Sequence, residues 1–489
     1  MRILRPLDIY KYLPQTNCEE CGEPNCMSFA AKLAEDRTLA EKCTPLFRDP
    51  KYNEKLEKYL NVIRPPVKAI RIGVGENAVN VGGKVVMFRH DLTWHNPTPL
   101  ALDVHDEMDE AVLTERVRFV NDFKFTRIGA DLKVDMVAIR CVSKSPEKFC
   151  KTVSRVAKLT TKPLILCSYN PEVLQEALIA VGTTRPLIYA ATKDNWKEVG
   201  ELASKYNCPV VASAPGDLST LESLAKSLRA VYGIDDMILD PGTGTEGNSF
   251  AESLNNFAAL RRTAVEVGDV SVGYPLIGIP AAVWLSPGED ATTTKLKESI
   301  FSSLLMTMYA DLIVFHSSDV WVLLSSLVWR QSVYTDPRTP PSVKPGVYEI
   351  GKPDEKSPLL VTGNFALTYF IVKEDMGKVK DPLWLLVSDS EATSIESAVA
   401  GRKFTVEKIV DAINESGIKE KLKHKTIIIP GFAARLSGEL EDALKDWKVF
   451  VGPRDSSAIK DFIEKVWKKE MYGEELPREV LTTQTSNPS

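Results

Sequence analysis

The sequence predicts an α/β protein in three folded parts: a small cysteine-rich module, a central (β/α)8 barrel and a smaller α/β domain. Half of the eight cysteines fall between residues 18 and 43. Through residues 67–335, apolar segments rich in Val, Ile and Leu alternate with amphipathic stretches, as in parallel strands connected by helices. A stretch with six prolines, residues 337–358, then precedes four further apolar segments. These observations predict the order of the parts along the chain.

Composition and charge argue against several classes of partner. The chain has 489 residues, 44% of them hydrophobic, which is enough to bury a core in each of several domains. Its formal net charge of -5 leaves no basic surplus for a nucleic-acid backbone or an anionic membrane. The longest apolar run is too short to span a bilayer, and the first residues lack the apolar core of a signal peptide. We therefore expect a soluble, cytoplasmic protein with small-molecule or protein partners.

The cysteine-rich module has metal-ligand spacing. The four cysteines follow the pattern Cys-x2-Cys-x4-Cys-x16-Cys and are Cys18, Cys21, Cys26 and Cys43. Thiolates spaced in this way can converge on one soft metal centre, and residues 25–36 read as a helix that returns the fourth thiolate. Three clustered cysteines and one separate cysteine favour a 4Fe-4S cluster. Structural zinc, which usually takes two tight pairs, is the alternative. Residues 1–62 are therefore predicted to form a 4Fe-4S module.

The central part is predicted to contain the eight strands of a barrel, within residues 67–335. The corresponding apolar segments begin at residues 84, 134, 163, 186, 209, 237, 280 and 311. Most neighbouring segments are separated by enough residues for one helix, which is the repeat of a (β/α)8 barrel. An open doubly wound sheet is the alternative, because strand counting from one sequence miscalls elements.

Polar residues that follow the predicted strands would line the ligand-facing end of such a barrel. The residues at these positions, or in the loop that follows, are Asp91, Asn170, Asp240 and Asn248. Each has a simpler alternative as a helix cap or an Asx turn, as Asp240 has before Pro241 and Gly242. The glycine-rich segment 240–248 lacks the Lys-Ser/Thr ending of a nucleoside triphosphate site.

The last third of the chain is predicted to be a proline-rich linker, residues 336–358, a Rossmann-like α/β domain, residues 359–472, and a flexible tail, residues 473–489. Loops with small residues follow its apolar strands, at Gly363-Asn364, Pro430-Gly431 and Gly452-Pro453-Arg454. Ligands bind at the carboxyl ends of strands in such sheets, and small residues let a large planar ligand approach the backbone. Ordinary turns are the alternative for these loops.

Taken together, these features resemble a known family over essentially the whole chain. The cysteine module, the barrel and the strings "TGNFALTYF", "IIIPGFAARLSGELE" and "VGPRDS" are similar to the large subunit of the corrinoid iron-sulfur protein. More narrowly, they resemble the archaeal gamma-subunit family of the acetyl-CoA decarbonylase/synthase complex.

The resemblance implies a methyltransferase that carries a methyl group on cobalt. The group would move between a methyl-tetrahydropterin, of the tetrahydrosarcinapterin or tetrahydromethanopterin type, and the acetyl-CoA synthase active site, by way of cobalt(I) and methyl-cobalt(III). The implied cofactors are a 4Fe-4S cluster, which reactivates cobalt(II) by reduction, and a base-off corrinoid (cobamide) without a histidine ligand. None of the five histidines stands in the Asp-x-His-x-x-Gly motif that many corrinoid methyltransferases place beneath cobalt.

The resemblance also implies that the corrinoid binds in the third part, through backbone and small side chains. The candidate contacts are Gly363, Asn364, Phe365, Thr368, Ser397, Gly431, Phe432, Gly438, Gly452 and Arg454. Ser397 matches a hydroxyl-bearing position near the lower face of the ring, where bacterial relatives carry Thr, and its alternative is a solvent-facing helix residue. We assign no side chain as the catalytic nucleophile, because cobalt has that role. Asn170 and Asp240 are the candidate residues of the barrel rim.

The implied partners are a smaller barrel subunit of the delta type in a heterodimer, the acetyl-CoA synthase and CO dehydrogenase subunits, and a low-potential electron donor. Nucleic acid and membrane are not expected. Two alternatives remain. The chain could be an iron-sulfur electron-transfer adaptor without its own corrinoid, or a barrel methyltransferase that binds the pterin itself through residues such as Asn170 and Asp240.

Overall fold

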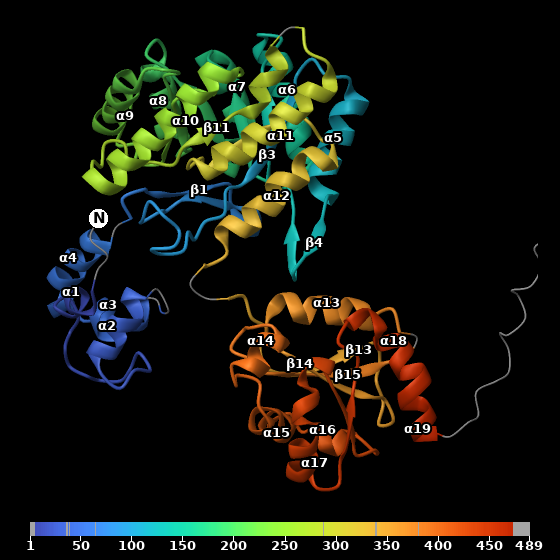
Figure 1. Cartoon of the computed structure of the whole chain (residues 1–489). Helices are drawn as coiled ribbons and strands as arrows, with labels where there is room; N and C mark the ends of the chain where they lie inside the picture. Colours follow the sequence, from blue (N-terminus) through green and yellow to red (C-terminus); the bar gives the residue numbers. More distant parts are fainter. Residues whose placement is uncertain are drawn as a thin grey trace, which may run out of the picture. The chain divides into compact units, whose positions relative to one another are not determined.

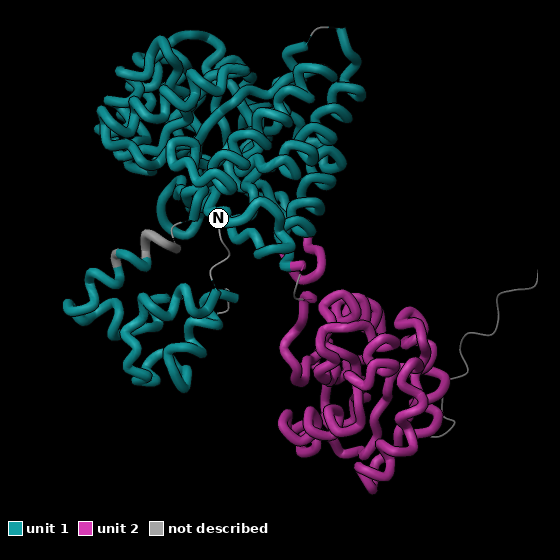
Figure 2. The backbone as a smooth tube through the Cα atoms, turned by 60° about the vertical axis from the view of Figure 1, so that its left-hand side comes forward, with its two compact units in different colours: residues 1–125, 132–336 teal, residues 126–131, 337–489 magenta. Residues whose placement is uncertain are grey.

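The computed structural model describes residues 5–472, apart from residues 36, 37, 39, 64, 287, 338, 339 and 380. The chain divides into two compact units, one of residues 1–125 and 132–336 and the other of residues 126–131 and 337–489 (Figure 2). The predicted tail, residues 473–489, lies outside the described residues. Within the described residues, no helix is both long enough and apolar enough to cross a membrane.

The N-terminal module consists of short helices around a core of its own. Its elements are α1 (Pro6–Tyr10), α2 (Cys26–Ala34), η1 (Ala40–Lys42), α3 (Thr44–Arg48), η2 (Pro50–Tyr52) and α4 (Asn53–Ile63). Helix α2 begins where Asn25 caps it, because the Asn25 side chain accepts a hydrogen bond from the backbone N–H of Ser28. Phe29 and Leu46 are buried together with Cys26 and Cys43, so two cysteines belong to the core of the module.

Eight parallel strands form a nearly closed barrel in the first unit, as the sequence predicted (Figure 1). They are β3 (Leu100–His105), β6 (Met136–Arg140), β7 (Leu164–Cys167), β8 (Leu187–Ala191), β9 (Val210–Ser213), β10 (Met237–Asp240), β11 (Ile277–Gly278) and β12 (Leu312–Phe315). Their order is β10-β9-β8-β7-β6-β3-β12-β11. A parallel bridge between Leu239 and Leu276 brings β10 to the segment before β11, which joins the two ends of the sheet.

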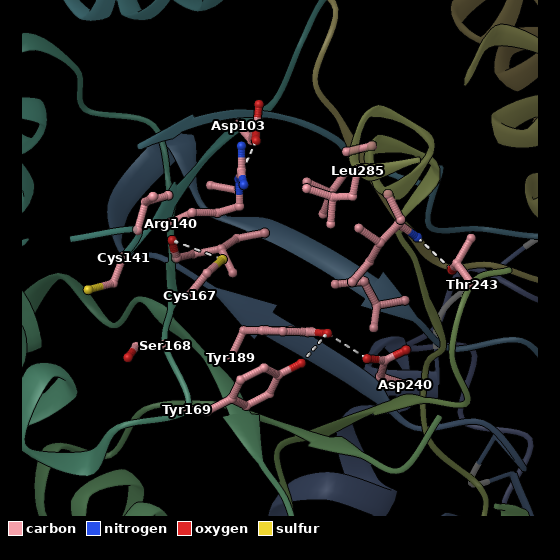
Figure 3. A pocket seen from close by; sticks show the side chains of 18 of the residues that line it. Asp103, Arg140, Cys141, Cys167, Ser168, Tyr169, Tyr189, Asp240, Thr243 and Leu285 are labelled. Carbon is pink, nitrogen blue, oxygen red and sulfur yellow. Dashed lines mark hydrogen bonds and ion pairs between the residues drawn. The ribbon is translucent and has the colours of Figure 1, made fainter. Parts of the chain in front are cut away.

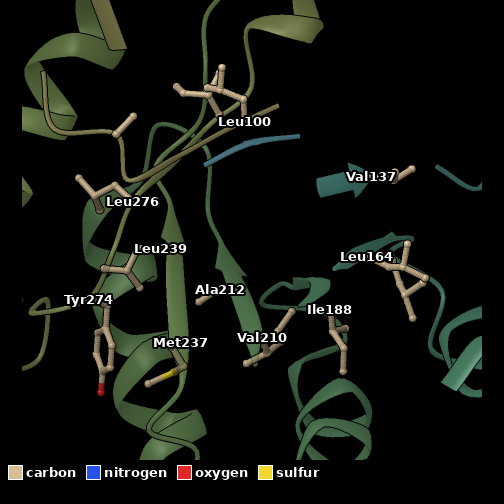
Figure 4. Packing of buried hydrophobic residues seen from close by; sticks show 14 of the residues in the cluster. Leu100, Val137, Leu164, Ile188, Val210, Ala212, Met237, Leu239, Tyr274 and Leu276 are labelled. Carbon is tan, nitrogen blue, oxygen red and sulfur yellow. The ribbon is translucent and has the colours of Figure 1, made fainter. Parts of the chain in front are cut away.

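Successive side chains along each strand point alternately into the barrel and outward, toward the helices. In β10, for example, Met237 and Leu239 pack in the outer cluster shown in Figure 4, whereas Ile238 belongs to the interior cluster. The hairpin of β1 (Ala69–Ile72) and β2 (Val79–Gly82) adds Ile70 and Val81 to that interior. A second, smaller hairpin is formed by β4 (Phe125–Arg127) and β5 (Ala130–Leu132).

Helices follow the barrel strands. They are α5 (Glu110–Asp122), α6 (Pro146–Leu159), α7 (Pro171–Val181), α8 (Trp196–Tyr206), α9 (Leu218–Tyr232), α10 (Gly247–Arg262), α11 (Ala291–Thr307) and α12 (Val320–Tyr334), with the 3-10 helices η3 (Gly75–Asn77) and η4 (Gly182–Thr184) and the π-helix η5 (Thr263–Val267). Their buried faces pack on the outer side of the strands. The strands and helices therefore alternate through the whole barrel.

Two of the eight predicted strands were wrong. The segment that begins at residue 84 forms no strand, because Gly82 and Gly83 both turn the chain with positive φ angles and the Nζ atom of Lys84 lies 2.7 Å from the Asp311 carboxylate. The first barrel strand is β3 instead. The segment at residue 280 is the turn η6 (Pro280–Leu285), because Pro280 has no N–H to continue the ladder, and β11 lies just before it.

The second unit contains a five-stranded sheet. Its strands are β13 (Gly346–Ile350), β14 (Leu359–Gly363), β15 (Leu383–Ser388), β16 (Thr426–Ile429) and β17 (Lys448–Val451), in the order β13-β15-β14-β16-β17. All pairs are parallel except β13 with β15. Strand β13 falls inside the segment that the sequence assigned to the linker. The strand order changes direction between β14 and β16, as in flavodoxin-like sheets.

Helices connect and cover the strands of this sheet. They are α13 (Ala366–Met376), α14 (Ile395–Ala400), α15 (Val406–Glu415), α16 (Ile418–Lys421), α17 (Ser437–Leu444), α18 (Ile459–Phe462) and α19 (Lys468–Tyr472), with the 3-10 helices η7 (Gly431–Leu436) and η8 (Ser456–Ala458) and the π-helix η9 (Ile463–Trp467). One hydrophobic cluster surrounds Phe404 and Leu440, and another surrounds Tyr369 and Trp467. Strands such as β14 and β16 contribute to both clusters, so the sheet is buried on both faces.

Candidate functional site

The four N-terminal cysteines lie on a loop with unusual backbone and on the helices that follow it. Cys18 is exposed, Cys21 is half-buried, and Cys26 and Cys43 are buried; all four are free thiols. Four residues of the loop have positive φ angles, namely Gln15, Asn17, Glu19 and Gly22. The Asn17 side chain accepts a hydrogen bond of 2.9 Å from the backbone N–H of Cys26 and so ties the loop to the start of α2. Left-handed residues of this kind persist where the surroundings of a site require them.

The thiols influence one another electrostatically. Burial raises the pKa of the Cys43 thiol above its usual range, and the charges of Cys26, Cys21 and Cys18 add to that rise. These charge effects place the four thiols near one another, and a cationic iron-sulfur cluster would stabilise them as thiolates. Among the described residues, no three His, Cys, Asp or Glu side chains converge on a point that could hold a single metal ion.

A cavity of about 250 Å³ lies at the carboxyl ends of β14, β16 and β17 in the second unit. This is the place where the strand order changes direction, which is where such sheets bind ligands. Four of the predicted corrinoid contacts line it: Thr368, Phe432, Gly452 and Arg454. The Arg454 guanidinium lies over the Phe432 ring at 5.6 Å from its centroid. Thr362 also lines the cavity, and its buried hydroxyl has no hydrogen-bond partner among the described residues.

Three other predicted contacts shape the loops next to the cavity. The amide oxygen of Asn364 accepts hydrogen bonds from Ser390 and from the N–H of Ala392, and its amide nitrogen donates to Asp389. A Cβ atom on Gly363 would lie 2.6 Å from the Ser390 hydroxyl, and one on Gly431 would lie 2.7 Å from the backbone nitrogen of Arg454. These residues hold the loop backbones close together.

The remaining predicted contacts, Phe365, Ser397 and Gly438, are not among the residues that line the cavity. Ser397 is exposed on α14, and its hydroxyl is 3.1 Å from that of Ser394, which does line the cavity. Sequence reasoning missed Thr362 and Ser394. Thr362 stands at the end of a buried apolar strand, and a polar residue in that position was the signal that could have found it.

A larger pocket, of about 630 Å³, opens at the carboxyl ends of the barrel strands (Figure 3). Its walls are largely apolar and include Trp284, Tyr169 and Leu285. Both candidate rim residues, Asn170 and Asp240, line it. The Asn170 side chain also caps α7, accepting a hydrogen bond from the N–H of Glu172. The two other candidates lie elsewhere: Asp91 follows the wrongly predicted strand, and Asn248 is exposed at the start of α10.

Two buried carboxylates of this pocket, Asp103 and Asp240, have pKa values shifted in opposite directions. Burial alone would raise the pKa of Asp103, but the hydrogen bond from His316 and the charges of His316, Arg140 and Arg116 outweigh it and hold that pKa below its usual range. Its two oxygens lie 2.6 Å from the His316 ring and 2.5 Å from the Arg140 guanidinium. Burial raises the pKa of Asp240, and hydrogen bonds from Tyr189, Gly242 and Ser213 offset only part of that rise. Within the described part of the chain, the hydrogen-bond partners of Asp240 are therefore all neutral.

Comparison with known proteins places these sites in context. The family described as CO dehydrogenase/acetyl-CoA synthase delta subunit matches residues 69–463. A family described by an Fe-S cluster matches residues 13–45, which contain all four clustered cysteines. The gamma 2 subunit of the acetyl-CoA decarbonylase/synthase complex of Methanosarcina thermophila is 44% identical over 469 residues, 96% of this chain and 99% of its own.

Other relatives bear the same name. The gamma subunit of the complex from Archaeoglobus fulgidus is 42% identical and covers 96% of this chain and 99% of its own. Among solved structures, a dihydropteroate synthase of Xanthomonas albilineans with 4-aminobenzoic acid covers 55% of this chain and 100% of its own, at 17% identity and a TM-score of 0.40. That score is too low to transfer a function.

Proposed function

The chain belongs to the family of gamma subunits of the acetyl-CoA decarbonylase/synthase complex, and we propose that it is the methyl carrier of such a complex. In this proposal the N-terminal module holds a 4Fe-4S cluster, the second unit holds a corrinoid, and the barrel pocket receives a methyl-tetrahydropterin. The observation that carries the proposal is the cavity at the switch point of the second unit, because residues predicted independently from the sequence line it.

The residues around that cavity fit a corrinoid. Thr368, Phe432 and Gly452 offer a hydroxyl, an apolar ring and a close approach to the backbone, and the unpaired Thr362 hydroxyl offers one hydrogen bond to a polar group. The cavity is smaller than a corrin ring, so it would take only part of the group. The bound corrinoid would supply cobalt, a nucleophile that accepts the methyl group. The chain's own residues would bind this group and leave its cobalt without a histidine ligand.

The cysteine module fits a low-potential electron source. All four thiols belong to one small module with its own core, and the Fe-S match supports an iron-sulfur cofactor there. Oxidation inactivates a cobalt nucleophile, so a carrier needs a reductant to restore it. A cluster held by Cys18, Cys21, Cys26 and Cys43 would pass electrons from an external donor to the corrinoid.

The barrel pocket fits a flat heterocycle with several N–H groups. Its volume lies within the range of small-molecule sites, its walls are apolar and aromatic, and Asp240 presents a buried carboxylate without a cationic partner among the described residues. N–H groups of a pterin would compensate that carboxylate. Arg140 and Lys144 on another wall would attract the acidic tail that pterin cofactors carry.

The proposed partner is a smaller barrel subunit of the delta type, with the CO dehydrogenase and acetyl-CoA synthase subunits beyond it. Helices α11 and α12 are neighbours, joined by a hydrogen bond of 2.7 Å between the Ser299 and Ser325 hydroxyls. Together they expose a row of large apolar side chains, each 41–51% exposed: Leu296, Ile300, Leu304, Trp321 and Trp329. We call this surface the α11/α12 face. Because this chain matches a family described as the delta subunit, the partner is expected to have a similar barrel, and one barrel would pack on the other here.

Reconstitution tests the proposal. The chain would be purified without oxygen together with its delta-type partner, loaded with iron, sulfide and a cobamide, and then reduced and given methyl-tetrahydropterin. We expect the methyl group to appear on the protein-bound corrinoid. The variant Gly452→Phe, which fills the cavity, should prevent corrinoid loading while leaving the iron content unchanged. Full loading of that variant would show that the corrinoid binds elsewhere.

The two alternative functions give different results in the same experiment. An electron-transfer adaptor would bind iron but no cobamide at any concentration. A barrel methyltransferase that transfers the group to a separate corrinoid protein would bind methyl-tetrahydropterin without binding cobamide. Removal of residues 1–60 separates the roles further, because methyl transfer from chemically reduced protein should continue while reactivation by a protein electron donor should stop.

A further inference from the structure

Three polar side chains form a chain of hydrogen bonds from the barrel interior into the barrel pocket. The Tyr189 hydroxyl donates to the Oδ2 atom of Asp240 at 2.7 Å. The hydroxyls of Tyr169 and Tyr189 are 3.4 Å apart, at the long end of hydrogen-bond distances. Asp240 is 1% exposed, whereas Tyr169 is 55% exposed. These hydrogen bonds therefore connect a buried carboxyl group to the part of the pocket that a substrate reaches (Figure 3).

The charged groups around these three hydrogen-bonded side chains favour proton transfer along them. No ion pair reaches Asp240 from the described residues, unlike Asp103 and Asp311, whose carboxylates are paired with cations. A carboxyl group in such surroundings exchanges its proton nearer to neutral pH than a solvated one does. Burial also raises the pKa of Tyr189, and the Asp240 charge raises it further. The Tyr189 phenol therefore stays neutral and can pass a proton on without remaining ionised.

One hydrogen bond of Asp240 has a purely structural role. Its Oδ1 atom accepts from the N–H of Gly242 at 2.9 Å, which is the Asx turn expected from the sequence. The Oδ2 atom is not needed for this turn. It accepts from two hydroxyls, those of Tyr189 and Ser213, the second at 2.8 Å. Ser213 is buried and does not line the pocket, whereas Tyr189 does, so Tyr189 is the hydroxyl partner of Asp240 that faces a substrate.

We propose that Asp240, Tyr189 and Tyr169 form a proton relay that serves the pterin nitrogen from which the methyl group departs. This inference rests on the proposed function. Methyl transfer breaks the N–CH3 bond, the electron pair of that bond stays on nitrogen, and the methyl group bonds to an electron pair of the acceptor. The nitrogen takes a proton from the Tyr169 hydroxyl. Tyr169 then takes a proton from the Tyr189 hydroxyl, and Tyr189 takes one from the Asp240 carboxyl group. After the product leaves, a proton from water returns to Asp240 through the exposed Tyr169 and then Tyr189. In the reverse reaction the same groups remove the proton.

Tyr169 is the member that would contact the methyl-bearing nitrogen, and Tyr189 and Asp240 act on that nitrogen through it. The relay is tested on the full chain with its partner subunit, cluster and corrinoid, by comparing Tyr189→Phe with Ser213→Ala. Each variant removes one hydroxyl from the same Asp240 oxygen, but Tyr189 lines the pocket and Ser213 does not. Two quantities are measured: the rate of methyl transfer against pH, in H2O and in D2O, and the number of protons exchanged when methyl-tetrahydropterin binds, by calorimetry in buffers of different ionisation enthalpy.

We expect Tyr189→Phe to slow transfer by about 100-fold, the low end of what general acid–base groups contribute, with little change in pterin affinity. Added imidazolium should restore part of the rate lost in Tyr189→Phe. The solvent isotope effect that the wild type shows should be absent in this variant. Asp240→Asn should abolish proton exchange on binding. Ser213→Ala should keep the isotope effect. Equal effects of the Tyr189 and Ser213 variants, or a wild-type pH profile in Tyr189→Phe, would overturn the relay. Absence of pterin binding to the wild type would overturn the proposed function of the barrel as well.

Discussion

The unpaired hydroxyl of Thr362 yields a prediction with opposite effects on stability and on corrinoid binding. This hydroxyl is buried at the end of β14 without a hydrogen-bond partner among the described residues. A buried polar group without a partner costs about 1–3 kcal/mol in proteins. Valine has nearly the same shape as threonine and no hydroxyl. Thr362→Val should therefore stabilise the second unit of the corrinoid-free chain by about 1 kcal/mol, the low end of that range.

The same substitution should weaken corrinoid binding. If the Thr362 hydroxyl donates or accepts one hydrogen bond to the bound group, its loss costs about 1 kcal/mol, which is about fivefold in the dissociation constant. Ser388 provides a matched control, because its hydroxyl is also buried and unpaired among the described residues but does not line the cavity. Ser388→Ala should leave corrinoid affinity unchanged.

Native-state hydrogen exchange of peptides from residues 359–451 measures the stability of this sheet without requiring the whole chain to unfold in one step. Cobamide titration followed by absorbance measures the affinity. Destabilisation of the corrinoid-free chain by Thr362→Val would show that the hydroxyl has a partner after all. Unchanged affinity in Thr362→Val would refute its placement against the corrinoid.

Three further predictions concern the other parts of the chain. Cys26→Ala should abolish the electron paramagnetic resonance signal of the reduced cluster while corrinoid stays bound; loss of both cofactors would mean that the two parts do not fold independently. Because burial raises the pKa of Asp240 in the folded state, its contribution to stability is full below the unfolded pKa of about 3.9 and is lost as pH rises through the folded pKa. Denaturant titrations should therefore show Asp240→Asn gaining stability over the wild type across that pH window, and a constant difference at all pH values would contradict the raised pKa. Ile300→Asp, on the α11/α12 face, should weaken the complex with the delta-type subunit in analytical ultracentrifugation but leave corrinoid content unchanged, and an unaltered sedimentation profile would place the interface elsewhere.

The barrel was predictable where the local pattern agreed with its tertiary role. Six of the predicted segments are barrel strands, for example residues 237–240. They are buried on both faces, so their sequences are continuous runs of apolar residues, which made them recognisable. The pattern misled at residue 84, where two glycines turn the chain and Lys84 pairs with Asp311 from more than 200 positions further along the chain. The two-residue strand β11 is too short to produce a pattern of its own.

The candidate sites were predictable to different degrees. Cysteine spacing in the sequence predicted an iron-sulfur module, because ligand chemistry limits which residues can take part, and the Fe-S family match over residues 13–45 supports that prediction. The cavity proposed for the corrinoid was predicted only through its loops, and the structure adds Thr362, at the end of a buried strand, and Ser394 to its lining. The connection of Asp240 to Tyr189 depends on the pairing of strands across the barrel, which sequence spacing does not contain.

Cofactor analysis tests the central claim most directly. The chain and its delta-type partner would be purified without oxygen, supplied with cobamide, and analysed for iron and cobalt per chain by mass spectrometry of the metals. A set of four cysteine thiolates predicts about four iron atoms per gamma-type chain, and the corrinoid cavity predicts one cobalt, lost in Gly452→Phe. Four iron atoms with cobalt that remains in Gly452→Phe, or iron without cobalt under saturating cobamide, would contradict the account of this chain as a corrinoid methyl carrier.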